Sequence, residues 1–263
     1  MKTVILIPAR YASSRFPGKP LAKLKLPNGE SKTLIELTWL TACKVKGISD
    51  IYIATDDKRI KEKAESFGAK VIMTSVHCAN GTERCADAFR QQKIKADLIV
   101  NLQGDAPLTP EWFIEALIDR MTRDQTISVS TPVIKVDQTT YGHFKDDRKN
   151  DKVGGTTVVF DKAQNALYFS KEVLPYLNLE NLRDSSNIPV FHHVGVYAYR
   201  PEGLNKYIKW EQGVLEKLEG LEQLRFLENG CAIKCVKVEA KGRVFWELNN
   251  PEDVERIEKV LLI

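Results

Sequence analysis

Residues 1–21 read MKTVILIPARYASSRFPGKPL, an apolar run that passes directly into a basic loop. The apolar residues at 4–7 predict a buried strand. Within a dozen positions the loop adds three cations and two hydroxyls, namely Arg10, Ser13, Ser14, Arg15 and Lys19. This concentration of positive charge at the end of one strand predicts an anion-binding site there.

A second apolar run, ADLIVNL at 96–102, ends in Gln103, Gly104 and Asp105. Such a run is typical of a strand that is covered on both faces. Strand-like and helix-like stretches alternate through the first half of the chain, which predicts a parallel sheet with helices on both faces. Ligands of such sheets bind at the carboxyl ends of the strands. We therefore expect the basic loop and Asp105 to lie close together.

Residue types that are common at helix N-termini predict where several helices begin. Thr33 and Glu36 have the spacing of a capping box for a helix over 33–46. Thr82 is expected to begin a second helix, and Thr109 to cap a third.

The second half gives less regular patterns. The polar stretch YGHFKDDRKNDKVGG at 141–155 is interpreted as an excursion or mobile loop. A single long helix is predicted over 214–227, with core packing by Leu215, Leu218, Leu221 and Leu224. The chain is expected to finish with strands at 231–238 and 244–248 and a helix capped by Asn250.

Composition excludes several classes of protein. The 263 residues include 39 basic and 35 acidic side chains, and this net charge of +4 does not favour a nucleic-acid partner. Apolar runs reach only about six residues, far from the roughly 20 that span a bilayer. Five cysteines without a Cys-x-x-Cys pair predict free thiols. We expect a cytoplasmic protein with no membrane insertion.

The loop over 8–19 fits neither of two common phosphate-binding templates. A Walker loop fails because position 13 is Ser and Pro20 follows Lys19, and no Gly-x-Gly-x-x-Gly follows the strand. A triphosphate also binds to distributed cations together with backbone N–H donors, and small residues at 12–14 and 18 let the backbone come close. Arg grips two phosphate oxygens and Lys supplies a movable charge. The loop has both.

Six stretches together carry a family resemblance that covers almost the whole chain. They are IPARYASSRFPGKPL at 7–21, YIATDD at 52–57, NGTER at 80–84, NLQGDAPL at 101–108, HHVGVYAYR at 192–200 and LEKLEGLEQLRFLENG at 215–230. In this order they resemble the 3-deoxy-manno-octulosonate cytidylyltransferases, which make a CMP-activated sugar acid for lipopolysaccharide or capsule synthesis.

The resemblance implies that the anomeric hydroxyl of a sugar acid attacks the α-phosphate of CTP and that pyrophosphate leaves. Arg10, Arg15 and Lys19 would hold the triphosphate and stabilise the charge on pyrophosphate, and with Asp105 they are the implied catalytic residues. Further nucleotide contacts are implied for Pro8, Ala9, Ser13, Ser14, Asn80, Gly81, Thr82 and Gln103.

The resemblance also implies a magnesium site and a sugar site. Asp105 matches the metal-binding aspartate of the family, but Asn249 replaces the second one. Asn keeps an oxygen donor and loses a charge, so Glu247, two residues earlier, is an alternative ligand for Mg²⁺. The sugar acid would contact Arg84, Gln103, Lys171, His193, Tyr197, Glu222 and Gln223.

Two further positions depart from the family near the sugar. Ala106 stands where Glu usually follows Gln-Gly-Asp, and Lys171 replaces the Arg of Phe-Ser-Arg. Lys cannot make the bidentate contact of Arg. A modified octulosonate or another α-keto sugar acid therefore fits as well as the parent acid.

The implied fold is a three-layer α/β/α, nucleotide-sugar transferase-like (Rossmann-like) mixed sheet. One cytidylyltransferase domain would cover 1–263, with a smaller inserted subdomain near 136–210 that forms a homodimer. Two other functions stay open. Asn249 favours a catalytically weakened nucleotide-binding paralogue, and a metal-dependent glycosyltransferase would usually carry Asp-x-Asp where this chain has Gln-Gly-Asp.

Overall fold

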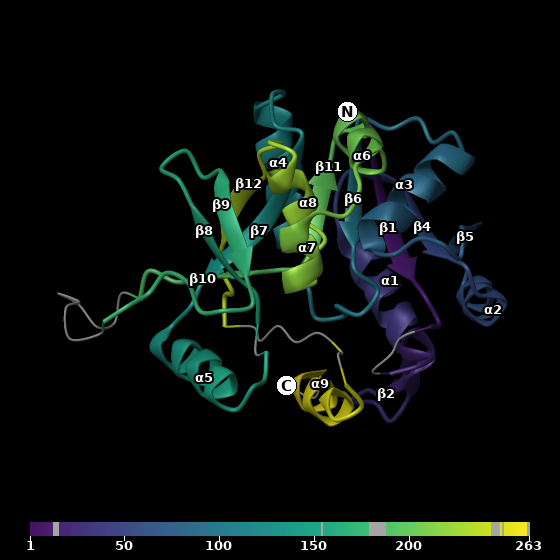
Figure 1. The fold of residues 1–263 in the computed structure, drawn as a ribbon. Coiled ribbons are helices and arrows are strands. Elements are labelled where there is room, and N and C mark those ends of the chain that lie inside the picture. The colour runs from purple at the N-terminus through teal and green to yellow at the C-terminus, as the bar shows by residue number, and fades with distance from the viewer. Residues whose placement is uncertain (13–15, 154, 179–187, 243–247, 249, 262–263) are drawn as a thin grey trace.

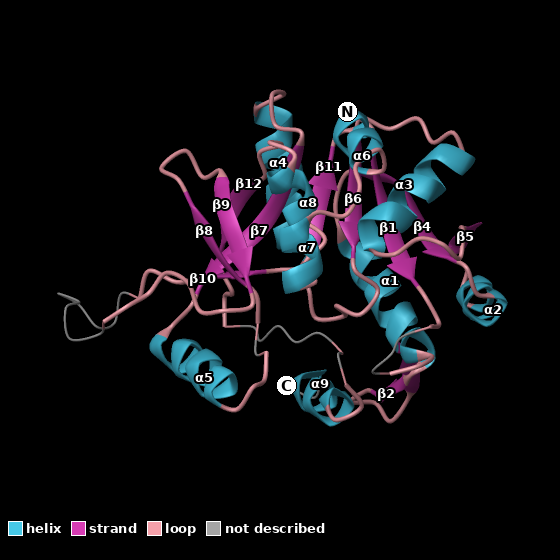
Figure 2. Cartoon of the chain, viewed as in Figure 1, coloured by secondary structure: helices cyan, strands magenta, loops and turns pink. Residues whose placement is uncertain are grey.

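A mixed β-sheet forms the centre of the protein in the computed structural model, which describes residues 1–12, 16–153, 155–178, 188–242, 248 and 250–261 (Figures 1 and 2). Within these residues the sheet has ten strands in the order β5-β4-β1-β6-β11-β7-β10-β8-β9, and the tenth strand, β12, pairs with β7. The parallel part comprises β5 (Lys70–Met73), β4 (Ile48–Thr55), β1 (Thr3–Ala9) and β6 (Leu98–Leu102).

Antiparallel pairs complete the sheet on the other side of β6. These strands are β11 (Val196–Tyr199), β7 (Val129–Lys135), β10 (Phe191–His193), β8 (Thr157–Phe160) and β9 (Ala166–Ser170), with β12 (Lys234–Val238) parallel to β7. The expected mixed sheet is confirmed.

Helices cover both faces of the sheet, which confirms the three layers (Figure 2). One face packs against α1 (Leu34–Lys44), α2 (Lys58–Ser66) and α4 (Glu111–Arg123). The other face packs against α3 (Gly81–Gln91), α6 (Pro201–Tyr207) and α8 (Leu224–Glu228). Alternate residues of β1 explain this, because Ile5 and Ile7 enter the first core whereas Val4 and Leu6 enter the second.

The C-terminal helix α9 (Asp253–Leu261) packs beside the small hairpin of β2 (Lys23–Lys25) and β3 (Ser31–Thr33) (Figure 1). Leu24, Leu34, Leu37, Leu248 and Ile257 form a third buried cluster there. The backbone N–H of Lys25 donates to Glu258 Oε1 at 2.8 Å. The end of the chain is thereby fixed to its beginning.

Three predicted helix starts need correction. Thr33 precedes α1 but its hydroxyl makes no cap, and Glu36 pairs with Lys32 instead of completing a capping box. Asn80 rather than Thr82 caps α3, because Asn80 Oδ1 accepts from the N–H of Glu83 at 2.8 Å.

The third correction concerns α4, which begins after Pro110, so that Thr109 is not its cap.

The polar stretch at 141–155 is largely helical, so its interpretation as a loop was wrong. Helix α5 (Gln138–Lys149) begins after Asp137, whose carboxylate accepts from the N–H of Thr140. Tyr141 and Phe144 lie on its buried face and pack with Ile188, Val190 and Val136. The many charges on the other face obscured this amphipathic pattern.

The long helix predicted over 214–227 is two short helices, α7 (Val214–Glu219) and α8. Gly220 separates them in the left-handed region, with φ of 62°. Because of this break Leu218 is 78% exposed and does not pack in the core, whereas Leu224 is fully buried.

The predicted ends of two further elements also move. The strand expected over 231–238 begins at Lys234, and the helix after Asn250 begins at Asp253. The strand expected over 244–248 falls almost entirely outside the described residues.

The range 136–210 contains two kinds of structure. Strand β11 and helix α6 belong to the main sheet and its core. Helix α5 has the separate small cluster with Ile188 and Val190. A role of this part in dimerisation stays a prediction.

All five cysteines are free thiols, as expected. Among the described helices, none combines the length and the apolar character needed to cross a bilayer.

Two glycines give a matched test of packing at the sheet edge. A Cβ at Gly104 would lie 2.7 Å from the carbonyl oxygen of Pro8, whereas a Cβ at Gly142, inside α5, would meet nothing within 4 Å. We expect Gly104→Ala to lower the free energy of unfolding by about 1–3 kcal/mol through this clash. Gly142→Ala should raise it by about 0.5–1 kcal/mol. Urea unfolding measures both, and a neutral Gly104→Ala would contradict the close approach of β1 and β6.

Candidate active site

An ion pair joins the basic loop to the end of β6. Lys19 Nζ donates to Asp105 Oδ2 at 2.6 Å, and both side chains are largely shielded, with 15% and 26% of their surface exposed. Lys19 begins a 3₁₀ turn (Lys19–Leu21) after β1, and Asp105 follows β6, the neighbour of β1. The expected meeting of the loop and the carboxylate at one sheet edge is confirmed.

Tyr11 and Gly18 fix the described part of the loop. The N–H of Gly18 donates to the carbonyl of Tyr11 at 2.9 Å, and Gly18 has φ of +72°, where glycine is favoured. The guanidinium of Arg59 lies 3.3 Å from the centre of the Tyr11 ring. Asp57 accepts two hydrogen bonds from Arg59, which lowers the pKa of the Asp57 carboxyl. Ser13, Ser14 and Arg15 lie outside the described residues.

Arg10 reaches across to the start of α3. Its side chain is exposed, and Nη1 donates to the carbonyl of Ala79 at 3.3 Å. Pro8 and Ala9 form the buried end of β1 beneath it. The loop cation thus lies beside Asn80, the cap of α3.

The chain near residue 248 lies directly against Asp105. The N–H of Leu248 donates to the backbone carbonyl of Asp105 at 3.0 Å. Glu247 and Asn249, the alternative second metal ligands, lie outside the described residues. Among described residues no group of three His, Cys, Asp or Glu could hold a metal ion. A single carboxylate at the sheet edge still suits Mg²⁺, which takes one or two carboxylates with phosphate oxygens and waters.

Glu222 joins α3 to the end of β6. Its two carboxylate oxygens accept from the backbone N–H of Thr82 at 3.0 Å and from Gln103 Nε2 at 2.9 Å. Burial raises the pKa of Glu222 to about 7, while the hydrogen bonds from the start of α3 act in the opposite direction. The anion at this helix start is therefore a side chain of the protein itself.

Gly81 allows Gln103 to reach Glu222. A Cβ at position 81 would lie 2.7 Å from Gln103 Nε2. Glycine at position 81, in the stretch NGTER, therefore leaves the space that the Gln103 side chain occupies. Whether Asn80, Gly81 and Thr82 also contact a nucleotide stays a prediction.

A cluster of buried polar groups lies between β10, β11 and α8. The Tyr197 hydroxyl donates to Gln223 Oε1 at 3.1 Å, and the ring of His193 lies 5.5 Å from that of Tyr197. His193 Nε2, Gln223 Nε2 and both amide atoms of Asn101 are buried without a hydrogen-bond partner in the described part of the chain. Unpaired buried polar atoms are rare and costly. These groups form a set of buried polar atoms without partners beside the Glu222 turn.

The two adjacent histidines point to opposite faces, as successive residues of a strand do. His192 packs against Phe144 of α5, with ring centres 5.3 Å apart, whereas His193 packs against Phe169 and Tyr197. Burial lowers the pKa of His193 to about 3. His193 is therefore neutral at pH 7, and it can offer a hydrogen bond but no positive charge.

Lys171 places a cation beside the turn that precedes Glu222. Its ammonium group would lie 3.1 Å from a Cβ at Gly220, in the turn just before Glu222. Glu219 fixes the same turn, because it accepts from Ser170 Oγ at 2.7 Å and from the N–H of Lys171 at 3.0 Å.

Arg84 has other partners than those of the predicted sugar site. It is buried, and its guanidinium donates to Thr74 Oγ1 at 2.6 Å and pairs with Asp56 at 3.1 Å. These contacts join α3 to the end of β4. Contact of Arg84 with a sugar remains a prediction.

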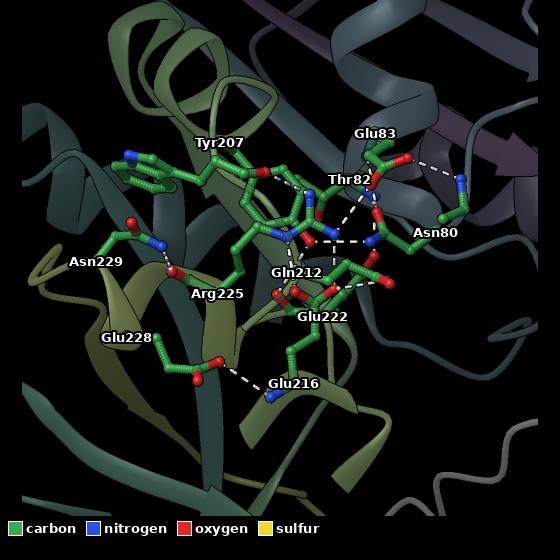
Figure 3. Close-up of polar contacts among 12 residues, drawn as sticks. Asn80, Thr82, Glu83, Tyr207, Gln212, Glu216, Glu222, Arg225, Glu228 and Asn229 are labelled. Atoms are coloured by element: carbon green, nitrogen blue, oxygen red, sulfur yellow. Dashed lines mark hydrogen bonds and ion pairs between the residues drawn. The ribbon is translucent and has the colours of Figure 1, made fainter. Parts of the chain in front are cut away.

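An ion-pair network supports the turn that carries Glu222 (Figure 3). Arg225 makes two hydrogen bonds to Glu216, both at 2.7 Å, and pairs with Glu83 of α3 at 2.9 Å. Only 3% of the Arg225 side chain is exposed. The Glu228 carboxylate accepts from the N–H of Glu216 at the start of α7. Helices α3, α7 and α8 are thus held together by charges within the protein.

Sequence reasoning did not find Asn101, Tyr207 or this network. Asn101 did give a signal, because it is the polar residue within the buried run LIVNL. The partners of Arg225 are far apart along the chain, so only the fold brings them together.

Comparison with known proteins identifies the family. The family model described as "Cytidylyltransferase" matches residues 4–238. A 3-deoxy-manno-octulosonate cytidylyltransferase of Maricaulis maris (strain MCS10) is 39% identical over 261 residues, covering 99% of this chain and 97% of the relative. An 8-amino-3,8-dideoxy-manno-octulosonate cytidylyltransferase of Shewanella woodyi (strain ATCC 51908 / MS32) is 43% identical over 265 residues, covering both chains fully.

A solved structure agrees with these relatives. The CMP:2-keto-3-deoxy-manno-octonic acid synthetase complexed with CTP superposes with a TM-score of 0.83 at 31% identity, covering 99% of this chain and 98% of the other. The fold corresponds, and each chain covers nearly the full length of the other. The chain therefore belongs to the cytidylyltransferases, in the 3-deoxy-manno-octulosonate cytidylyltransferase family.

Proposed function

We propose that the protein activates an eight-carbon 3-deoxy α-keto sugar acid with CTP, giving the CMP-sugar and pyrophosphate. The observation that carries this proposal is the Lys19–Asp105 ion pair at the common end of β1 and β6. A polyphosphate at this edge would lie beside two cations of the loop, Lys19 and Arg10. Family membership supplies CTP as the nucleotide.

Bond making and breaking occur at the α-phosphorus. The anomeric hydroxyl oxygen forms a bond to phosphorus and loses its proton to water, while the bond to the bridging oxygen of pyrophosphate breaks and negative charge gathers on the leaving group. Lys19 can turn from Asp105 toward that charge, because a Lys ammonium is a movable donor on a flexible stem. Positioning and charge stabilisation are the main contributions that a protein makes to phosphate transfer.

Asp105 is the residue proposed to hold a magnesium ion, with Asn249 or Glu247 as its partner. A bound divalent cation would supply Lewis-acid polarisation and charge neutralisation of the phosphates. The hydrogen bond from Leu248 to Asp105 supports this choice, because residues 247 and 249 are its chain neighbours. Lys19 pairs with this carboxylate in the structure.

The sugar acid is proposed to occupy the buried polar cluster. His193, Gln223 and Asn101 offer unpaired groups to hydroxyls, and Glu222 offers a carboxylate. Lys171 is the cation available to the sugar carboxylate, since His193 is neutral. The relatives include enzymes named for the parent acid and for its 8-amino form, so both acids are candidates.

The setting of the reaction follows from the resemblance alone. We propose a cytoplasmic homodimer that serves lipopolysaccharide or capsule synthesis, with the contact between subunits near residues 136–210.

The first test is pyrophosphate release from CTP with each sugar acid over a range of Mg²⁺ concentrations. We expect turnover with at least one acid, and a loss of about 100- to 1000-fold in kcat for each of two variants. Lys19→Met removes positive charge at the developing pyrophosphate, and Asp105→Asn removes the carboxylate proposed to hold Mg²⁺. Lys46→Met, a matched surface change, should retain full activity. CTP binding without turnover on either acid would instead indicate a nucleotide-binding paralogue.

The second test is the pH dependence of kcat/KM for the sugar acid, which reports ionisation in the free enzyme. The pKa of Glu222 lies at about 7, so its carboxylate forms as the pH rises through that value. We expect kcat/KM to rise by up to about tenfold per pH unit below that pKa and to level off above it. Glu222→Gln should be less active and should lose this rise, whereas the exposed Glu62→Gln should retain it. An identical profile in Glu222→Gln would exclude Glu222 as the group that titrates.

A further inference from the structure

The hydroxyl of Tyr207 contacts both halves of the candidate site (Figure 3). It accepts a hydrogen bond from Asn80 Nδ2 at 2.9 Å, and it donates to the backbone carbonyl of Glu222 at 3.1 Å. One oxygen atom therefore joins the start of α3 to the turn before α8. Thr82 in the first segment and Glu222 in the second are 140 positions apart in the chain.

Tyr207 is fixed and permanently protonated. Its side chain is fully buried at the end of α6, with the Arg225 guanidinium 4.2 Å from the ring centre and the Phe226 ring at 4.8 Å. Burial raises the pKa of Tyr207 far above its ordinary value. The hydroxyl thus keeps its proton at any physiological pH and always donates it.

The first half that Tyr207 contacts belongs to the nucleotide side. Asn80 caps α3 with its Oδ1, and its Nδ2 donates a hydrogen bond to Tyr207. Both polar atoms of the amide are therefore fixed. The adjacent carbonyl, of Ala79, accepts the hydrogen bond from Arg10 of the basic loop. A shift of Asn80 would therefore move the surface that faces the triphosphate.

The second half belongs to the sugar side. The carbonyl of Glu222 is held by Tyr207, and its carboxylate is held by Thr82 and Gln103. Gln223, the next residue, contacts Tyr197 in the buried polar cluster. A shift of this turn would move the groups that face the sugar acid.

We propose that Tyr207 is a positioning residue that couples CTP binding to sugar-acid binding, an inference that rests on the proposed function. Because its hydroxyl ties the two halves to one geometry, ordering of α3 by the nucleotide also orders the Glu222 turn. Part of the conformational cost of sugar binding is then met when the nucleotide binds. This role does not require Tyr207 to contact the reacting atoms.

The test is the coupling factor between the two substrates. Calorimetry measures the dissociation constant of the sugar acid alone and with saturating cytidine 5′-(α,β-methylene)triphosphate, which cannot release pyrophosphate, and the ratio of the two constants is the coupling factor. We expect Tyr207→Phe, which keeps the ring and its packing, to lower this factor about three- to tenfold. Tyr52→Phe, a matched change on β4 outside the site, should retain the wild-type factor.

Asn80→Ser provides a second variant should Tyr207→Phe unfold, because Ser still caps α3 but cannot reach Tyr207. It should lower the coupling factor in the same direction, and the double variant should show no further loss beyond Tyr207→Phe, since Tyr207→Phe already removes the hydrogen bond that Asn80→Ser removes. A coupling factor in Tyr207→Phe equal to that of the wild type, or additive losses in the double variant, would overturn the inference. Turnover of the wild-type protein with CTP tests the proposed function separately, so a failed coupling test with intact turnover refutes the role of Tyr207 alone.

Discussion

The contact between Lys19 and Asp105 depends on the way parallel strands end. Strands β1 and β6 run in the same direction side by side, so the segments that leave them emerge at one edge of the sheet. A cation from one segment and a carboxylate from the other then lie 2.6 Å apart although 86 positions separate them in the chain. The close approach of Gly104 to Pro8 serves the same geometry, because any larger residue would push the second segment away from the first.

Glu222 shows how the protein stabilises a charge that it needs in a shielded place. Burial favours the neutral carboxyl, whereas the N–H groups at the start of α3 and the amide of Gln103 favour the ionised form. Burial outweighs these hydrogen bonds and raises the pKa to about 7, which leaves the carboxyl able to change its charge near neutral pH. The ion pair between Arg225 and Glu216 is fully enclosed, and such a pair fixes an arrangement more than it adds stability.

Much of the fold follows from local patterns, and the errors have particular causes. The apolar runs of β1 and β6 predict their own burial, and Asp105 follows from its place after such a run. Helix α5 was missed because its apolar face is only Tyr141 and Phe144 among many charges. The cap of α3 was assigned two residues late, because Asn80 and Thr82 are both good caps. In the structure the Thr82 hydroxyl pairs with the Tyr199 hydroxyl, whereas Asn80 Oδ1 accepts from the N–H of Glu83. Tyr207 and Arg225 could not be found, since their partners come from remote segments.

Leu248 has a consequence for the order in which the protein matures. Its side chain is buried with Leu24, Leu34 and Ile257, and its N–H is bound to the carbonyl of Asp105. During translation, the sheet strands β1 and β6 leave the ribosome long before the stretch around 248 and the helix α9 that holds it in place. A nascent chain can therefore pair β1 with β6 before Leu248 is available to bind the carbonyl of Asp105, so the sheet edge around Asp105 is completed late in synthesis.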